Sequence, residues 1–181
     1  MHMGKNTTSS LLRECIVQGL LLLLQEKPLE DISVKEIVEK AGVNRSTYYR
    51  HFRDKEEVAR HFYRLRLDEA LATAYQGITP LDYLAGIFAR FLQYREELLL
   101  LEKHNLTYLL LVEMNSRIPQ VHSPREGAAH SLHCNYHIGG VFNSFRYWLS
   151  ENMATAPEKL AAQCMTFLPE NFAPMLLKRR E

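Results

Sequence analysis

The sequence is poor in the features that stabilise small secreted domains, zinc ribbons and membrane spans. It has 3 cysteines in 181 residues (Cys15, Cys134 and Cys164), too few and too scattered for a disulfide framework or a cysteine-rich zinc site. Each has apolar neighbours, which favours buried free thiols in a reducing compartment. The apolar run at 15–24 is shorter than the about 20 residues that span a bilayer, and no small-residue cleavage site follows it. We therefore expect a cytoplasmic protein with no membrane partner.

Alternating β-branched runs, which mark strands, are also missing, and Leu, Ala, Glu, Arg and Gln dominate. Apolar residues make up 46% and charged residues 24% of the chain, as is usual for a soluble protein with a real core. Apolar residues at helical spacing, with breaks at Pro28, Gly42 and Pro80, predict an all-α fold. The expected helices cover residues 11–26, 34–40, 45–52, 54–75, 80–101, 105–116, 126–152 and 157–167, with a loop over 118–124.

Patterns that mark common enzymes are absent as well. No Ser-His-Asp arrangement or Gly-rich phosphate loop stands out, and a di-iron bundle would need Glu-x-x-His pairs on two helices. Glu126 and His130 are separated by one residue too many for such a pair. His130, His133 and His137 have a spacing that can hold a metal, but no acidic or cysteine partner is fixed nearby, and histidines that line a core or pocket are commoner. We predict a protein that is not an enzyme and has no metal or cofactor.

The net charge of +1 is unevenly distributed along the chain. Residues 1–66 hold 12 Lys and Arg against 9 Asp and Glu, whereas residues 67–181 hold 10 against 12. Within residues 44–66, seven basic residues accompany three acidic ones. A basic N-terminal patch on a weakly acidic body suits a DNA-binding protein with a separate second domain. A solvated helix surface is the alternative explanation of the same charges.

Residues 31–63 have the pattern of a helix-turn-helix. Ser33 and Glu36 predict a capping box at the start of a short helix. Gly42 is suited to end that helix, and Asn44 can cap the next one. The two helices share an apolar seam, which consists of Ile32, Ile37, Val38, Ala41, Val43, Tyr48 and Phe52.

The second of these helices presents hydrogen-bond donors away from the seam. Arginine can reach guanine O6 and N7 in the major groove, and hydroxyl groups donate to phosphates. At the start of the following helix, Asp54 and Glu57 predict a second capping box, and Lys55 can contact a phosphate. The candidate DNA-binding residues are Arg45, Ser46, Thr47, Tyr49, Arg50, His51 and Lys55.

The pattern S-V-x-x-I-x-x-x-A-G-V-N-x-x-T-x-Y-x-H-F-x-x-K-E-x-V resembles the DNA-binding domain of the TetR/AcrR family, over about residues 7–63. The resemblance implies an all-helical homodimer that binds a palindromic operator in double-stranded DNA, usually as a repressor released by a small ligand. A relative that acts as a co-activator or protein-interaction module, without binding DNA itself, is the alternative.

By position in this motif, Arg45 and Ser46 would face base edges, and Arg50 would contact either bases or phosphates. Phosphate contacts would come mainly from Thr47, Tyr49, His51 and Lys55. Tyr48 and Phe52 would be buried. Family members often carry glycine or another small residue where Ser46 stands.

The C-terminal half resembles the family more loosely, through residues 136–149 and the helix expected from Pro157. In the family, the last two helices form a four-helix bundle with their symmetry mates. The residues expected at a dimer interface form one apolar stripe: Ile138, Val141, Phe142, Phe145, Trp148 and Leu149. The residues expected to line a pocket for a small apolar or aromatic effector are Phe88, Phe91, Tyr94, Tyr108, Leu111 and Tyr136. Packing inside one subunit is the alternative for both sets.

The sequence therefore predicts an all-α protein with two domains. Residues 1–53 would form a three-helix, helix-turn-helix DNA-binding domain. Residues 54–181 would form a helical domain for effector binding and dimerisation.

Overall fold

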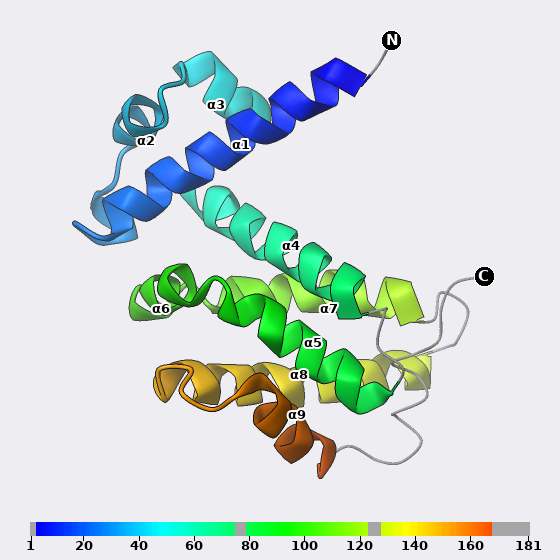
Figure 1. The fold of residues 1–181 in the computed structure, drawn as a ribbon. Coiled ribbons are helices and arrows are strands. Elements are labelled where there is room, and N and C mark those ends of the chain that lie inside the picture. The colour runs from blue at the N-terminus through cyan, green and yellow to red at the C-terminus, as the bar shows by residue number, and fades with distance from the viewer. Residues whose placement is uncertain (1–2, 75–78, 123–127, 168–181) are drawn as a thin grey trace. The chain divides into compact units, whose positions relative to one another are not determined.

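A computed structural model of the chain describes residues 3–74, 79–122 and 128–167, and all regular structure in these residues is helical (Figure 1). The predicted all-α fold is confirmed. The chain divides into two compact units: unit 1 comprises Met1–Phe62 and Leu100–Leu106, and unit 2 comprises Tyr63–Leu99 and Thr107–Glu181. The functional boundary at residue 53 stays a prediction.

Unit 1 contains the helix-turn-helix. Its elements are α1 (Met3–Leu24), the 3-10 helix η1 (Leu29–Asp31), α2 (Val34–Ala41), α3 (Arg45–His51) and the first turns of α4 (Lys55–Ala74). Both α2 and α3 contact α1 (Figure 1). Gly19 of α1 permits the close approach of α2, because a Cβ atom there would lie only 3.0 Å from the carbonyl oxygen of Ile37.

Local capping defines the ends of α2 and the start of α3 as the sequence predicts. The Ser33 hydroxyl accepts a hydrogen bond from the backbone N–H of Glu36 (3.2 Å), and the Ser33 N–H donates to the Glu36 carboxylate (2.9 Å). Gly42 ends α2 in the left-handed region at φ 66°. The side chain of Asn44 then caps α3 through the N–H of Thr47. These bonds satisfy N–H groups that a helix end leaves without a partner.

Unit 2 is a set of helices around an aromatic core. It contains the rest of α4, α5 (Pro80–Leu92), the start of α6 (Arg95–Lys103), α7 (Tyr108–His122), α8 (Ala128–Ser150) and α9 (Pro157–Met165). Helix α5 packs against α9, and α7 against α8. Phe88 meets Trp148 edge to face, with ring centroids 5.7 Å apart, and Phe91 meets Phe145 at 5.2 Å. Such pairs add about 0.5–1.5 kcal/mol beyond the burial of their area.

Two predicted boundaries are wrong. The helix expected over 80–101 is broken, because the N–H groups of Gln93 and Tyr94 bond three residues back and tighten the end of α5 before α6 begins. The loop expected over 118–124 is helical as far as His122. Pro119 removes one backbone hydrogen bond from α7 without ending the helix.

The structure also bears on the expected absence of a membrane span and on the expected burial of the cysteines. Among the residues that the structure describes, no helix is both long enough and apolar enough to span a bilayer. Cys164 is buried as expected, whereas Cys15 on α1 is exposed. The side chain of Cys134 lies outside the described residues.

Candidate nucleic-acid interface

Helix α3 has one buried and one exposed face. Tyr48 is completely buried and Phe52, at the C-cap of the helix, is 3% exposed, so the two rings fix α3 on the core of unit 1. On the other side Tyr49 is 56% exposed. The remaining candidate DNA-binding residues of α3 follow the same division: Arg45, Ser46 and Arg50 are exposed, and Thr47 and His51 are half-buried. Their placement suits groove binding, and their contacts with DNA stay predictions.

The N-cap of α3 also orients the side chain of Ser46. The Asn44 Oδ1 atom accepts from the Thr47 N–H at 2.8 Å and from the Ser46 hydroxyl at 2.7 Å. Ser46 is therefore held against its own helix cap while it remains exposed. The sequence motif predicted the cap but not this second bond.

His51 lies in a positively charged neighbourhood. Partial burial lowers its pKa, and the charges of Arg13 and Arg50 lower it further. Arg13 belongs to α1, so α1 contributes a cation beside the last turn of α3. A neutral imidazole carries one N–H donor and can therefore still donate a hydrogen bond to a phosphate.

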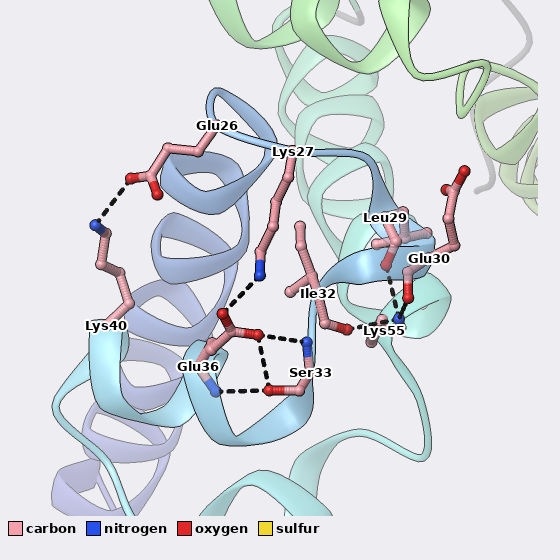
Figure 2. A network of polar contacts seen from close by, with 9 residues as sticks. All are labelled: Glu26, Lys27, Leu29, Glu30, Ile32, Ser33, Glu36, Lys40 and Lys55. Carbon is pink, nitrogen blue, oxygen red and sulfur yellow. Dashed lines mark hydrogen bonds and ion pairs between the residues drawn. The ribbon is translucent and has the colours of Figure 1, made fainter.

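Lys55 forms bonds inside unit 1 that the sequence did not predict (Figure 2). Its ammonium group donates to the carbonyl oxygens of Leu29 (2.6 Å), Glu30 (3.1 Å) and Ile32 (2.6 Å). An ammonium group has three N–H donors, and these three carbonyls engage all of them. These bonds occupy the ammonium group, and the phosphate contact expected of Lys55 stays a prediction. The side chain fastens the start of α4 to the segment between α1 and α2.

Charged side chains hold the same segment from the other side (Figure 2). The Glu36 carboxylate accepts from Lys27 at 2.6 Å in addition to its bonds with Ser33. The hydrogen bond from Lys27, followed by those from Ser33, lowers the pKa of Glu36 to about 2. Lys40 of α2 also pairs with Glu26, just beyond the end of α1, at 3.3 Å. The connection from α1 to α2 is thus tied to both α2 and α4.

The second predicted capping box forms only in part. The Glu57 N–H donates to the Asp54 carboxylate at 2.7 Å, as predicted. The return bond differs, because the Glu57 carboxylate accepts from the backbone N–H of Arg53 (2.7 Å). The Arg53 side chain itself is 83% exposed. It is therefore an accessible cation in the turn between α3 and α4.

Comparison with known proteins agrees with this geometry. Residues 16–62 match the profile of bacterial regulatory proteins of the tetR family. The N-terminal domain belongs to the tetR family. No curated protein sequence gives a significant match to the chain.

Two solved structures extend the likeness beyond the N-terminal domain. A TetR transcriptional regulator from Streptococcus agalactiae 2603V is 22% identical, with a TM-score of 0.56, and the match covers 92% of this chain and 98% of that one. The dihydroxyacetone kinase operon activator DhaS is 18% identical, with a TM-score of 0.53, and the match covers 86% of this chain and 93% of that one. At these identities the likeness establishes the fold alone.

In unit 2, the six predicted effector-binding residues have different surroundings, and a pocket formed by them stays a prediction. Phe88 and Phe91 are buried against aromatic rings of α8. Tyr108 is 45% and Tyr136 is 77% exposed. Leu111 is half-buried, and Tyr94 belongs to a polar network. For Phe88 and Phe91, core packing accounts for the aromatic spacing that suggested a pocket.

The side chains of the predicted dimer stripe on α8 are mostly buried within a single chain. Ile138, Phe142, Phe145, Trp148 and Leu149 are each at most 6% exposed within a single chain, and Val141 is half-buried. Side chains that are buried in one subunit offer no area to a second copy. The indole N–H of Trp148 also donates to the carbonyl oxygen of Thr155 at 2.8 Å, which anchors the ring inside the subunit. The stripe is the core of unit 2.

The opposite face of α8 is exposed and partly apolar. Leu132, Tyr136 and Tyr147 are 73%, 77% and 63% exposed. Gly139 and Gly140 lie on the same face, and a Cβ atom at either would meet no atom within 4 Å. A cavity of about 500 Å³ opens here between α8 and the end of α9, and its lining includes Tyr136, Gly140, Asn143, Cys164 and Phe167. The glycines therefore leave space that the described residues do not fill.

A polar network that the sequence did not reveal joins α4 to α5. The Glu69 carboxylate accepts from Arg66 (2.8 Å), from the Tyr94 hydroxyl (2.7 Å) and from Arg90 (3.1 Å). Burial raises the pKa of Glu69, but the Tyr94 bond and the two arginine charges outweigh it and hold the pKa below its usual value. The Arg66 guanidinium also stacks on the Tyr94 ring, 4.1 Å from its centroid.

A second network joins α4 to α7. The buried Glu113 carboxylate forms a two-point pair with Arg64, at 3.2 and 3.3 Å. Arg117, one turn further along α7, pairs with Asp68 at 2.5 Å. These partners are 49 residues apart in the sequence. No local sequence pattern could have revealed them.

The structure describes only part of the histidine cluster whose spacing could hold a metal. His137 is buried, while the side chains of His130 and His133 lie outside the described residues. Among the side chains that the structure describes, no group of three or more potential ligands is close enough to hold a metal ion.

Proposed function

We propose that this chain is a DNA-binding transcriptional regulator that places α3 in the major groove of duplex DNA. The supporting observation is the division of α3 into two faces. Tyr48 and Phe52 are buried, whereas Arg45, Tyr49 and Arg50 are exposed side by side. A rigid helix with a row of exposed donors is suited to contact base edges and phosphates together.

Selection of duplexes from a randomised DNA pool tests this proposal. The full chain should enrich a palindromic site, and Arg45→Ala should relax base preference within it at a cost of roughly 1–3 kcal/mol. If the chain binds no DNA even at low salt, the proposal fails and the protein-interaction module becomes the better explanation.

The proposed regulator is a cytoplasmic homodimer. The two halves of a palindrome lie about 34 Å apart, which is one turn of DNA. Two copies of α3 must therefore be held at that distance, and a two-fold symmetric dimer can do this. The exposed face of α8 is the surface we assign to the second copy. Its support is the family resemblance together with three exposed apolar side chains, Leu132, Tyr136 and Tyr147. Gly139 and Gly140 would let two helices approach closely.

The finer part of the proposal is repression that a small apolar or aromatic ligand relieves. Its support is the resemblance to the family, whose members are usually repressors of this kind. DhaS is described as an operon activator, so the sign of regulation needs its own test. A reporter gene placed behind the selected operator should be silenced by the chain; higher reporter output would identify an activator.

A further inference from the structure

The direction of one hydrogen bond at the start of α3 is determined by chemistry. Asn44 caps the helix by accepting from the backbone N–H of Thr47 (2.8 Å). Because a backbone N–H only donates, the capping atom of Asn44 must be its carbonyl oxygen and not its amide nitrogen. The Ser46 oxygen lies 2.7 Å from that same atom. A carbonyl oxygen cannot donate, so the Ser46 hydroxyl must.

This bond leaves Ser46 able to accept hydrogen bonds from solvent or a partner but not to donate one. A hydroxyl has one proton and two lone pairs, and the proton is engaged by Asn44. The side chain is nevertheless exposed, on the part of α3 that turns away from Tyr48. Ser46 therefore offers lone pairs, and the complementary group on a partner is an N–H donor.

We propose that Ser46 reads an exocyclic amino group, adenine N6 or cytosine N4, by accepting a hydrogen bond from it. The inference rests on the proposed function, since it specifies the base chemistry that one α3 residue selects. In the major groove, adenine and cytosine present amino donors, whereas guanine O6 and N7 and thymine O4 are acceptors. An amino group adds a bond to the existing one with Asn44. An acceptor would gain a bond only if Ser46 left Asn44, so the number of bonds would not rise.

The expected preference follows from the strength of one neutral hydrogen bond. Such a bond changes an equilibrium constant by about 3- to 10-fold. Ser46 should therefore favour an amino-bearing base over a carbonyl-bearing base at its position by that factor. Ser46→Ala should abolish this preference and leave the fold intact, because the Asn44 cap bonds to the Thr47 backbone and remains in place.

The experiment uses the full chain and two steps. Sites are first selected from randomised duplexes with the wild type and with Ser46→Ala, which identifies the base pair whose preference depends on Ser46. The amino group at that pair is then removed from the major groove, by 2-aminopurine in place of adenine or by 2-pyrimidinone in place of cytosine. Wild-type binding should weaken about 3- to 10-fold, and Ser46→Ala should not weaken further.

Tyr49→Phe is the matched control, because it removes another exposed hydroxyl from the same helix. Its effect should add to that of amino removal, with no coupling between the two. The inference is overturned if amino removal leaves wild-type affinity unchanged, or if Ser46→Ala alters no base preference while Arg45→Ala still does. In both cases the proposed function stands. If no sequence is selected at all, the inference and the proposed function fail together.

Discussion

The ammonium nitrogen of Lys55 lies 2.6 Å from the carbonyl oxygen of Ile32, which is 23 residues earlier in the chain. Two further carbonyls, those of Leu29 and Glu30, share the same ammonium group. A lysine at the start of α4, directly after the helix-turn-helix, is an obvious candidate for phosphate binding. Its position here makes it a brace between α4 and the segment that precedes α2.

Replacement of Lys55 by methionine should reduce stability more than it alters the electrostatics of DNA binding. Methionine keeps much of the side chain's bulk and removes all three charged hydrogen bonds, so the free energy of unfolding should fall by about 1–3 kcal/mol. At a temperature where the variant is folded, its salt dependence of DNA binding should match the wild type. Lys35→Met, at a 72% exposed position of α2, is the control for loss of one positive charge. If the slope of log binding constant against log salt concentration is lower by about 1 for Lys55→Met, Lys55 contacts a phosphate after all.

Tyr48 and Tyr49 are adjacent and should respond in opposite ways to loss of the hydroxyl. The Tyr48 hydroxyl is buried without a hydrogen-bond partner, and burial raises the pKa of that phenol above its usual range. Tyr48→Phe removes an unsatisfied polar atom and should stabilise the chain by up to roughly 1–2 kcal/mol, with DNA affinity unchanged. Tyr49→Phe should leave stability unchanged and weaken DNA binding. Thermal melting and DNA titration of both variants check this, and a lower melting temperature for Tyr48→Phe would contradict it.

Glu36 should make the stability of the chain depend on pH in the acid range. Its pKa is about 2 in the folded chain against 4.5 for an ordinary glutamate. Because the folded value is the lower one, its contribution is complete above pH 4.5 and is lost as the pH falls toward 2. Denaturant unfolding at a series of pH values should therefore show a shallower acid decline for Glu36→Gln than for the wild type. Glu39→Gln, also on α2, should keep the wild-type decline; identical curves for all three chains would refute the assignment.

The two faces of α8 should separate folding from dimerisation. Trp148→Ala, in the core of unit 2, should cost about 3–5 kcal/mol of stability. Gly140→Leu should leave the single subunit as stable as before, because a Cβ there meets no atom within 4 Å and leucine is a better helix former. It should nevertheless abolish the dimer by filling the space between the two copies. Sedimentation with thermal melting tests both variants, and an intact Gly140→Leu dimer would place the interface elsewhere.

The helix-turn-helix was largely predictable because the residues that cap and end its helices act locally. Ser33, Gly42 and Asn44 act within a few residues of their own positions, and the structure uses each as the sequence indicated. The alternation of Tyr48 and Tyr49 between core and solvent follows from the helical period once the seam is identified. The bond from Ser46 to Asn44 is equally local, but side-chain rotamers decide it, and residue types alone do not specify them.

By itself, the sequence determined an all-helical chain, the helix-turn-helix and its caps, and the surface that α3 exposes, because these depend on contacts between near neighbours. Only the tertiary structure decided which face of α8 is core, where α5 ends, and that Lys55 braces unit 1. The core face of α8 and the role of Lys55 depend on pairs such as Phe88 with Trp148 and Lys55 with Ile32, which are far apart in the chain. A helical pattern shows that a face is apolar. It does not show whether that face meets its own subunit or another.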